Sequence, residues 1–158
     1  MNNLNLVLPE IFISISIMFL LVLGVFKKDS SKLIFNISLI VLFITLIITF
    51  NETFAINRKT LFNDSVVIDY MSSLMKIITL IATFLVLVIS SSYLKTTKIF
   101  KIEYPILILS SVLGMLIMIS SNDLIVFYMG LELQSLALYV LATFNRDKLK
   151  SSEAGLKY

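Results

Sequence analysis

Five long apolar stretches, separated by short polar connections, constrain this chain more than any other feature. They span residues 8–26, 33–50, 71–94, 105–121 and 124–144. Each is close to the roughly 20 residues that an α-helix needs to cross about 30 Å of hydrocarbon. A segment in lipid satisfies its backbone hydrogen bonds internally as a helix, so length outweighs the many β-branched residues of 33–50. The expected fold class is all-α, a polytopic membrane protein with five transmembrane helices.

Composition also indicates that lipid is the solvent of this chain. Of its 158 residues, 58% are hydrophobic and 15% are charged, whereas a soluble domain has about 25% charged residues. The sequence contains no Cys and no His. Disulfides, thiolate or imidazole metal ligands and a histidine proton relay are therefore excluded. We expect no metal or cofactor on this chain, and no nucleic acid among its partners.

The connections are too short to form further domains, so residues 1–158 are expected to make a single transmembrane domain. The longest connection covers about residues 51–70. Pro9 and Pro105 lie in the first turn of their helices, where the missing N–H costs little. Asn122 or Asp123 is expected to cap the fifth helix. The tight polar break before it predicts that the fourth and fifth helices form an antiparallel hairpin.

The basic residues alternate between connections. They are frequent after the first, third and fifth helices, rare between the second and third, and absent before the first and between the fourth and fifth. The frequent group is Lys27, Lys28 and Lys32, then Lys95, Lys98 and Lys101, then Arg146, Lys148, Lys150 and Lys157; the rare group is Arg58 and Lys59. The positive-inside rule then predicts an external N-terminus and an internal tail. The first helix lacks the basic n-region of a signal peptide, so we interpret it as retained.

Two ionisable residues, Glu132 and Lys76, lie well inside apolar stretches. A charge at the bilayer centre costs at least about 2.5–3.5 kcal/mol, so each is expected to face a partner or water. At 100° per residue, Glu132 belongs to a polar stripe along one helix face. The stripe consists of Tyr128, Glu132, Ser135, Tyr139 and Thr143. A carboxylate flanked by hydroxyl groups suits a hydrated proton path.

Structural interpretations remain open beside these functional ones. Glu132 also suits a polar contact between helices. Lys76 also suits snorkelling toward the outer interface, or a local pair with Asp69 seven residues earlier. Glu10 and Asp123 lie at helix starts, where acids interact favourably with the helix dipole, and we interpret both as structural.

A longer motif resembles a known family. It is carried by residues 103–124, 130–141 and 152–158, with Gly-Leu-Glu-Leu-Gln-Ser-Leu at 130–136 as its core. The motif resembles the subunit N family of bacterial NADH:quinone oxidoreductase (respiratory complex I), whose mitochondrial counterpart is NADH dehydrogenase subunit 2. The resemblance is weaker at Leu8-Pro9-Glu10, and at Asp69-Tyr70-Met71 with Lys76.

The resemblance implies a fold and a function. Subunits of this family have an antiporter-like fold and translocate protons when quinone is reduced elsewhere in the complex. Glu132 matches the essential glutamate of their fifth helix, which is thought to pair with a lysine two helices later. Lys157 matches a lysine near the start of helix six, which we expect to begin with a Ser cap at 151–152. The later lysines would lie beyond Tyr158, so we expect a truncated chain or one half of a split subunit.

The resemblance also implies partners and a location. The chain would carry no redox chemistry, and NADH, FMN, iron–sulfur clusters and quinone would bind partner subunits. Its partners would be other membrane subunits of complex I and the lipid bilayer. The expected location is the bacterial inner membrane, with the mitochondrial inner membrane as the alternative. Two other functions stay open: a membrane subunit of a related cation/proton antiporter or membrane-bound hydrogenase, and a structural assembly subunit without transport.

The orientation is testable because the chain has no native cysteine. A single cysteine introduced at Ser151 should react with a membrane-impermeant thiol reagent only after the membrane is opened, and one at Asn57 should react in intact cells. Labelling of position 151 from the outside would overturn the predicted topology.

Overall fold

The computed structural model describes residues 6–26, 31–53, 58–96, 101–145 and 149–157. It is dominated by helices: α1 (Leu8–Phe26), α2 (Ser31–Thr53), α3 (Tyr70–Thr96), α4 (Glu103–Ser120), α5 (Leu124–Ala142) and α6 (Leu149–Lys157). The first five are each long and apolar enough to cross a membrane. The predicted all-α polytopic fold class is therefore confirmed.

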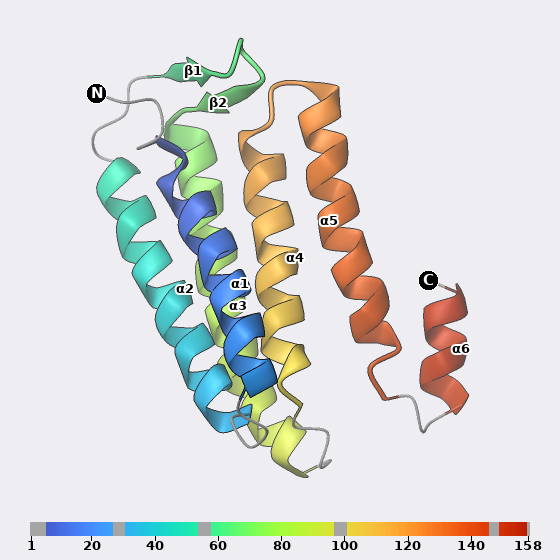
Figure 1. Ribbon diagram of the computed structural model, residues 1–158. Helices are drawn as coiled ribbons and strands as arrows, with labels where there is room; N and C mark the ends of the chain where they lie inside the picture. The colour runs from blue at the N-terminus through green and yellow to red at the C-terminus, as the bar shows by residue number, and fades with distance from the viewer. Residues whose placement is uncertain (1–5, 27–30, 54–57, 97–100, 146–148, 158) are drawn as a thin grey trace.

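Helices α1 to α4 form a bundle, and α5 lies along the outer side of α4 (Figure 1). The core consists of aliphatic side chains from α1 to α4, among them Ile13, Leu20, Leu42, Leu80, Leu109 and Leu116. In α5 the buried residues are Gly130 and Ala137. The predicted α4–α5 hairpin is thus present, but most of the α5 surface is left uncovered by the described part of the chain.

The connection between α2 and α3 contains a small antiparallel hairpin, which the sequence analysis did not predict. Strand β1 (Lys59–Leu61) pairs with β2 (Val66–Ile68). The hairpin reaches the α4–α5 turn, where the Asn122 N–H donates to the Ser65 carbonyl and the Asn122 side chain donates to the Asp64 carbonyl. Asn122 therefore secures the hairpin, and Asp123 is the residue that caps α5.

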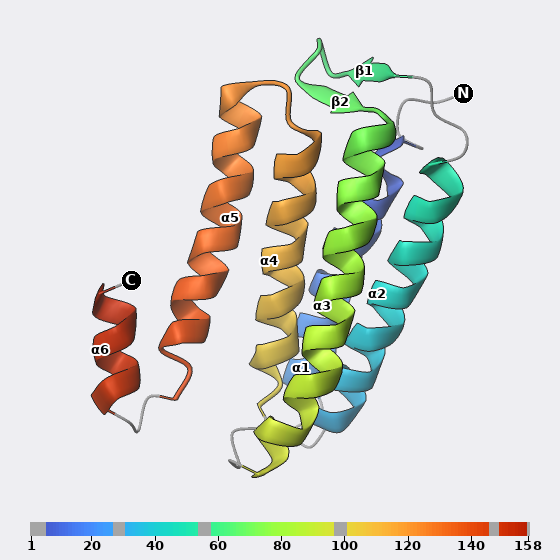
Figure 2. The same cartoon turned by 180° about the vertical axis from the view of Figure 1, so that it is seen from behind.

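The start of α6 also differs from expectation. The helix begins at Leu149, so Ser151 is a helical residue and not the expected cap. The Ser151 hydroxyl donates to the Ala142 carbonyl at the end of α5. Close to it, Gly155 packs against the Thr143 side chain. These contacts hold α6 against the end of α5, from which it runs back alongside that helix (Figure 2).

The two ends of the bundle differ in charge. At one end, here called the hairpin end, lie the start of α1, the β-hairpin and the α4–α5 turn (Figure 1). At the opposite end, here called the basic end, α2 begins beside Lys32 and α4 begins beside Lys101. This separation agrees with the alternation of basic residues along the sequence. Asn57, the labelling position proposed for the opposite side of the membrane, lies outside the described residues. Which end faces the cytoplasm stays a prediction.

Two glycines bring α4 and α5 close together. A Cβ atom on Gly114 would lie 2.7 Å from both the Gln134 nitrogen and the Gly130 oxygen. A Cβ atom on Gly130 would lie 2.9 Å from the Gly114 oxygen. Small residues allow this approach of helix backbones in membranes, where lipid supplies no hydrophobic driving force for association. The Gly114–Gly130 contact therefore sets the position of α5.

We expect Gly114→Ala to destabilise the protein by about 1–3 kcal/mol, because the added methyl group meets backbone atoms that cannot rotate away. Gly24→Ala is the control, since its Cβ would lie 2.9 Å from the Ile102 Cγ2 methyl group, a side-chain contact in place of the backbone contacts of Gly114. Both are measured as free energies of unfolding in detergent micelles. Equal effects of the two substitutions would contradict this account of α4–α5 packing.

Candidate functional site

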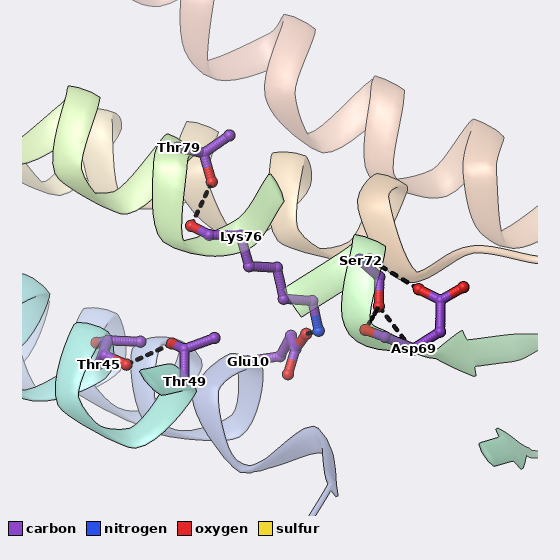
Figure 3. Close-up of polar contacts among 7 residues, drawn as sticks. All are labelled: Glu10, Thr45, Thr49, Asp69, Ser72, Lys76 and Thr79. Carbon is purple, nitrogen blue, oxygen red and sulfur yellow. Dashed lines mark hydrogen bonds and ion pairs between the residues drawn. The ribbon is translucent and has the colours of Figure 1, made fainter. Parts of the chain in front are cut away.

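Among the described residues, the buried or half-buried charged side chains of the membrane-spanning helices include a pair at the α1–α3 interface and Glu132 on α5. At the first place, Asp69 and Ser72 cap the start of α3 through two reciprocal hydrogen bonds. The Ser72 N–H donates to Asp69 Oδ1, and the Ser72 hydroxyl oxygen accepts a hydrogen bond from the Asp69 N–H. One turn further along, Lys76 points into the bundle toward α1 (Figure 3). The cap thus fixes where α3 begins, and with it the position of Lys76 along the helix.

Lys76 forms an ion pair and hydrogen bond with Glu10 across the α1–α3 interface (Figure 3). Only 2% of the Lys76 side chain and 8% of the Glu10 side chain are exposed. Glu10 Oε1 accepts the bond, whereas Oε2 is buried without a hydrogen-bond partner among the described residues. The pair is therefore enclosed by the protein itself.

This geometry corrects three interpretations made from the sequence. Lys76 does not extend toward the interface, because it is buried. It does not pair with Asp69, whose carboxylate caps α3. Glu10 is not simply an acid at a helix start, since it is the counter-ion of Lys76. Sequence reasoning missed Glu10 as a site residue because 66 positions separate it from its partner, although Leu-Pro-Glu in the first turn of an apolar helix was a signal.

The second place is the polar stripe on α5. Glu132 is half-buried, and its carboxylate interacts with the Tyr128 phenol one turn earlier. The Ser135 hydroxyl donates to the Glu132 backbone carbonyl, and the Thr143 hydroxyl donates to carbonyls one turn before it. Tyr128 and Tyr139 are exposed. The stripe is thus half-buried to exposed in the described part of the chain, and its role stays a prediction.

The structure does not bring the three predicted proton-translocation residues together. Within the described part of the chain there are two ion pairs, Lys76 with Glu10 and Lys157 with Glu153, and Glu132 takes part in neither. The second pair is an exposed contact between residues four apart in α6. Glu132, Lys76 and Lys157 therefore belong to three separate environments.

A cavity of about 360 Å³ lies between α3, α4 and α5. Its walls are mostly apolar, with hydroxyl groups from Thr79, Thr83 and Ser111. On α5 it is lined by Leu138 and Leu141, so it lies beside α5 without including Glu132. The described residues thus do not enclose Glu132 in a closed channel.

Comparison with known proteins supports the resemblance seen in the sequence. A family model described as "NADH:quinone oxidoreductase/Mrp antiporter, TM" matches residues 121–158. NADH-quinone oxidoreductase subunit N of Pelagibacter ubique is 65% identical over 158 residues, which are 100% of this chain and 33% of that protein. The subunits N of Paramagnetospirillum magneticum and Bartonella bacilliformis are each 44% identical, over 96% and 99% of this chain.

These similarities confirm the predicted resemblance to subunit N. They cover nearly the whole chain, but the chain spans about a third of the length of the curated relatives it matches. The matched stretch 121–158 contains Glu132 and α6, and the wider match also contains Glu10 and Lys76.

We expect Lys76→Met to destabilise the protein by about 3–5 kcal/mol, because it leaves the buried Glu10 carboxylate without its counter-ion. Glu10→Gln together with Lys76→Met should recover most of that loss, since no charge then stays buried. The measurement is the free energy of unfolding in detergent micelles. Glu132→Gln, on the open face of α5, serves as comparison and should cost less than Lys76→Met. Additive effects of Glu10→Gln and Lys76→Met would contradict the pairing.

Proposed function

We propose that this chain, which is similar along its whole length to subunit N of NADH-quinone oxidoreductase, forms part of a proton-translocating subunit of that complex. The observation that carries the proposal is Glu132, a carboxylate inside a membrane-spanning helix and within a stripe of hydroxyl groups. A carboxylate in that setting binds and releases protons, while neighbouring hydroxyl groups hold water along the path. Quinone reduction elsewhere in the complex supplies the free energy.

The open face of α5 suggests how Glu132 acts. Helices α1 to α4 leave the stripe uncovered, and the relatives are about three times as long as this chain. Further helices of the full-length subunit would cover this face and supply a lysine partner for Glu132. Pairing and unpairing with that lysine would change the proton affinity of the carboxylate. We also place Lys157, at the end of α6, and Lys76 in the translocation machinery.

The remaining assignments follow from this function. Other membrane subunits of the complex and lipid are the partners of the chain. NADH oxidation, FMN, the iron–sulfur clusters and quinone are assigned to partner subunits. For the iron–sulfur clusters this agrees with the sequence, which lacks the Cys and His ligands that such clusters use. The location is a bacterial inner membrane, with the hairpin end outside and the basic end in the cytoplasm. The bacterial sources of the similar subunits support that choice over mitochondria.

A cation/proton antiporter subunit is the second candidate, because the matching family model also names Mrp antiporters. The similar full-length proteins are named as subunits of NADH-quinone oxidoreductase, which favours the first candidate. A purely structural assembly subunit is disfavoured by Glu132, since hydroxyl groups alone would suffice for a helix contact.

In the full-length subunit within its complex, Glu132→Gln should lower proton uptake per NADH at least about two-fold while the amount of assembled complex stays near normal. Glutamine keeps the shape and the hydrogen bonding of the side chain but carries no charge. Glu132→Asp should have a milder effect, because the charge remains and is shortened by one methylene group. Proton uptake and NADH oxidation are measured together in membrane vesicles.

Gln134→Ala is the matched control, because the Gln134 backbone and Cβ lie at the Gly114 contact with α4, away from the stripe. It should disturb packing more than pumping. Normal proton uptake with Glu132→Gln would show that the carboxylate is structural. Loss of assembly with Glu132→Gln would support the helix-contact interpretation instead.

A further inference from the structure

We infer that Glu10 and Lys76 form a second proton-exchange site, placed near the hairpin end of the bundle and separate from Glu132. The inference rests on the proposed function and adds Glu10, α1 and α3 to the proton-handling part of the chain. Three observations carry it: the burial of the pair, the carboxylate oxygen that has no partner among the described residues, and the buried hydroxyl-bearing residues around the pair.

Burial couples the protonation of the two groups. Both side chains are nearly inaccessible, so neither charge is stabilised by bulk water. Glu10 Oε1 is occupied by Lys76, while Oε2 is buried and has no partner among the described residues. Buried carboxylate oxygens normally have partners, so an oxygen without one is an available acceptor for a proton or a water molecule.

The surrounding side chains supply hydroxyl groups. On α2, Thr45 and Thr49 lie near Glu10 (Figure 3). On α3, Ser72 and Ser73 are buried near the lysine. The Asp69 carboxylate, just before α3, is engaged in the helix cap, where its Oδ1 accepts the Ser72 N–H. Glu10 and Lys76 are thus each other's counter-ion, and a proton gained by one directly affects the other.

Two pockets lie along α3 where it faces α4. Toward the hairpin end, a surface pocket of about 300 Å³ is lined by Asp69 and Ser72 near the start of α3 and by Ile119 of α4. Toward the basic end, Thr79 and Thr83 line the cavity between α3, α4 and α5. The Thr79 hydroxyl donates to the Lys76 carbonyl, and the Thr83 hydroxyl donates to the Thr79 carbonyl. Neither lining includes Glu10 or Lys76, so exchange with these pockets requires water between them and the pair.

The exchange step conserves protons and charge. Starting from carboxylate and ammonium, Glu10 takes a proton on Oε2 from the hairpin side, which leaves the Lys76 ammonium without its counter-ion. Lys76 then releases a proton to a water molecule, which leaves a neutral carboxylic acid and a neutral amine at the pair. Transfer of the carboxyl proton to the amine restores the ion pair. One proton has entered and one has left.

A purely structural ion pair is the competing explanation. A buried ion pair can often be replaced by uncharged residues without loss of stability, because its desolvation penalty offsets its attraction. The double variant Glu10→Gln/Lys76→Met therefore keeps the α1–α3 contact and removes only the exchangeable protons. The exchanged variant Glu10→Lys/Lys76→Glu keeps one acid and one base at the interface.

The experiment uses the full-length subunit in its assembled complex, in membrane vesicles. Groups that relay protons commonly contribute about 10²-fold or more to a rate, so the double variant should lower proton uptake per NADH at least about two-fold with assembly intact. The exchanged variant should recover part of that loss. Ser38→Ala, which removes a buried hydroxyl of α2, is the control and should pump normally.

A second readout does not depend on pumping. On acidification of the purified complex, infrared difference spectra should show the carbonyl band of protonated carboxyl groups, and Glu10→Gln should remove one component of that band. Normal proton uptake in the double variant, or an unchanged carboxyl band with Glu10→Gln, would overturn the inference. If the double variant does not assemble, the infrared comparison alone decides. If the inference fails but Glu132→Gln still lowers proton uptake, the proposed function stands. If Glu132→Gln pumps normally, the proposed role of Glu132 is rejected.

Discussion

Lipid offers no hydrogen bonds to a charged side chain, so every charge inside the bilayer has to be compensated within the protein or by water that the protein admits. The chain meets this constraint in two ways. Lys76 and Glu10 compensate one another at the α1–α3 interface, where both are enclosed. Glu132 instead lies on the open face of α5 beside Tyr128. None of the described helices supplies a positively charged partner for its carboxylate, so the charge has to be compensated by groups outside the described residues or by water.

Helix α4 lies between these two centres. It packs against α1 and α3 on one side and against α5 on the other. The Gly114–Gly130 contact places the α5 backbone close to it, which fixes the side of the bundle to which the polar stripe faces. The cavity between α3, α4 and α5 contains the hydroxyl groups that follow Lys76 along α3. Packing by small residues and pairing of charges therefore position the two ionisable sites on opposite sides of α4.

Hydropathy and length were enough to predict the five helices, because each crosses the membrane as an independent apolar unit. The polar stripe followed from helical periodicity. The Glu10–Lys76 pair could not be predicted in the same way, since it depends on how α1 docks on α3, and local alternatives such as Asp69 fitted the sequence equally well. The β-hairpin was missed because strands of three residues are too short for a periodic pattern.

The identity of the assembly is the most direct test of the account. An affinity tag on the full-length subunit, followed by mild detergent extraction, should recover a membrane complex that oxidises NADH and reduces quinone, together with its flavin and iron–sulfur centres. Recovery of the subunit in an assembly that carries cations and protons but has no NADH-oxidising activity would contradict the account and favour the antiporter function.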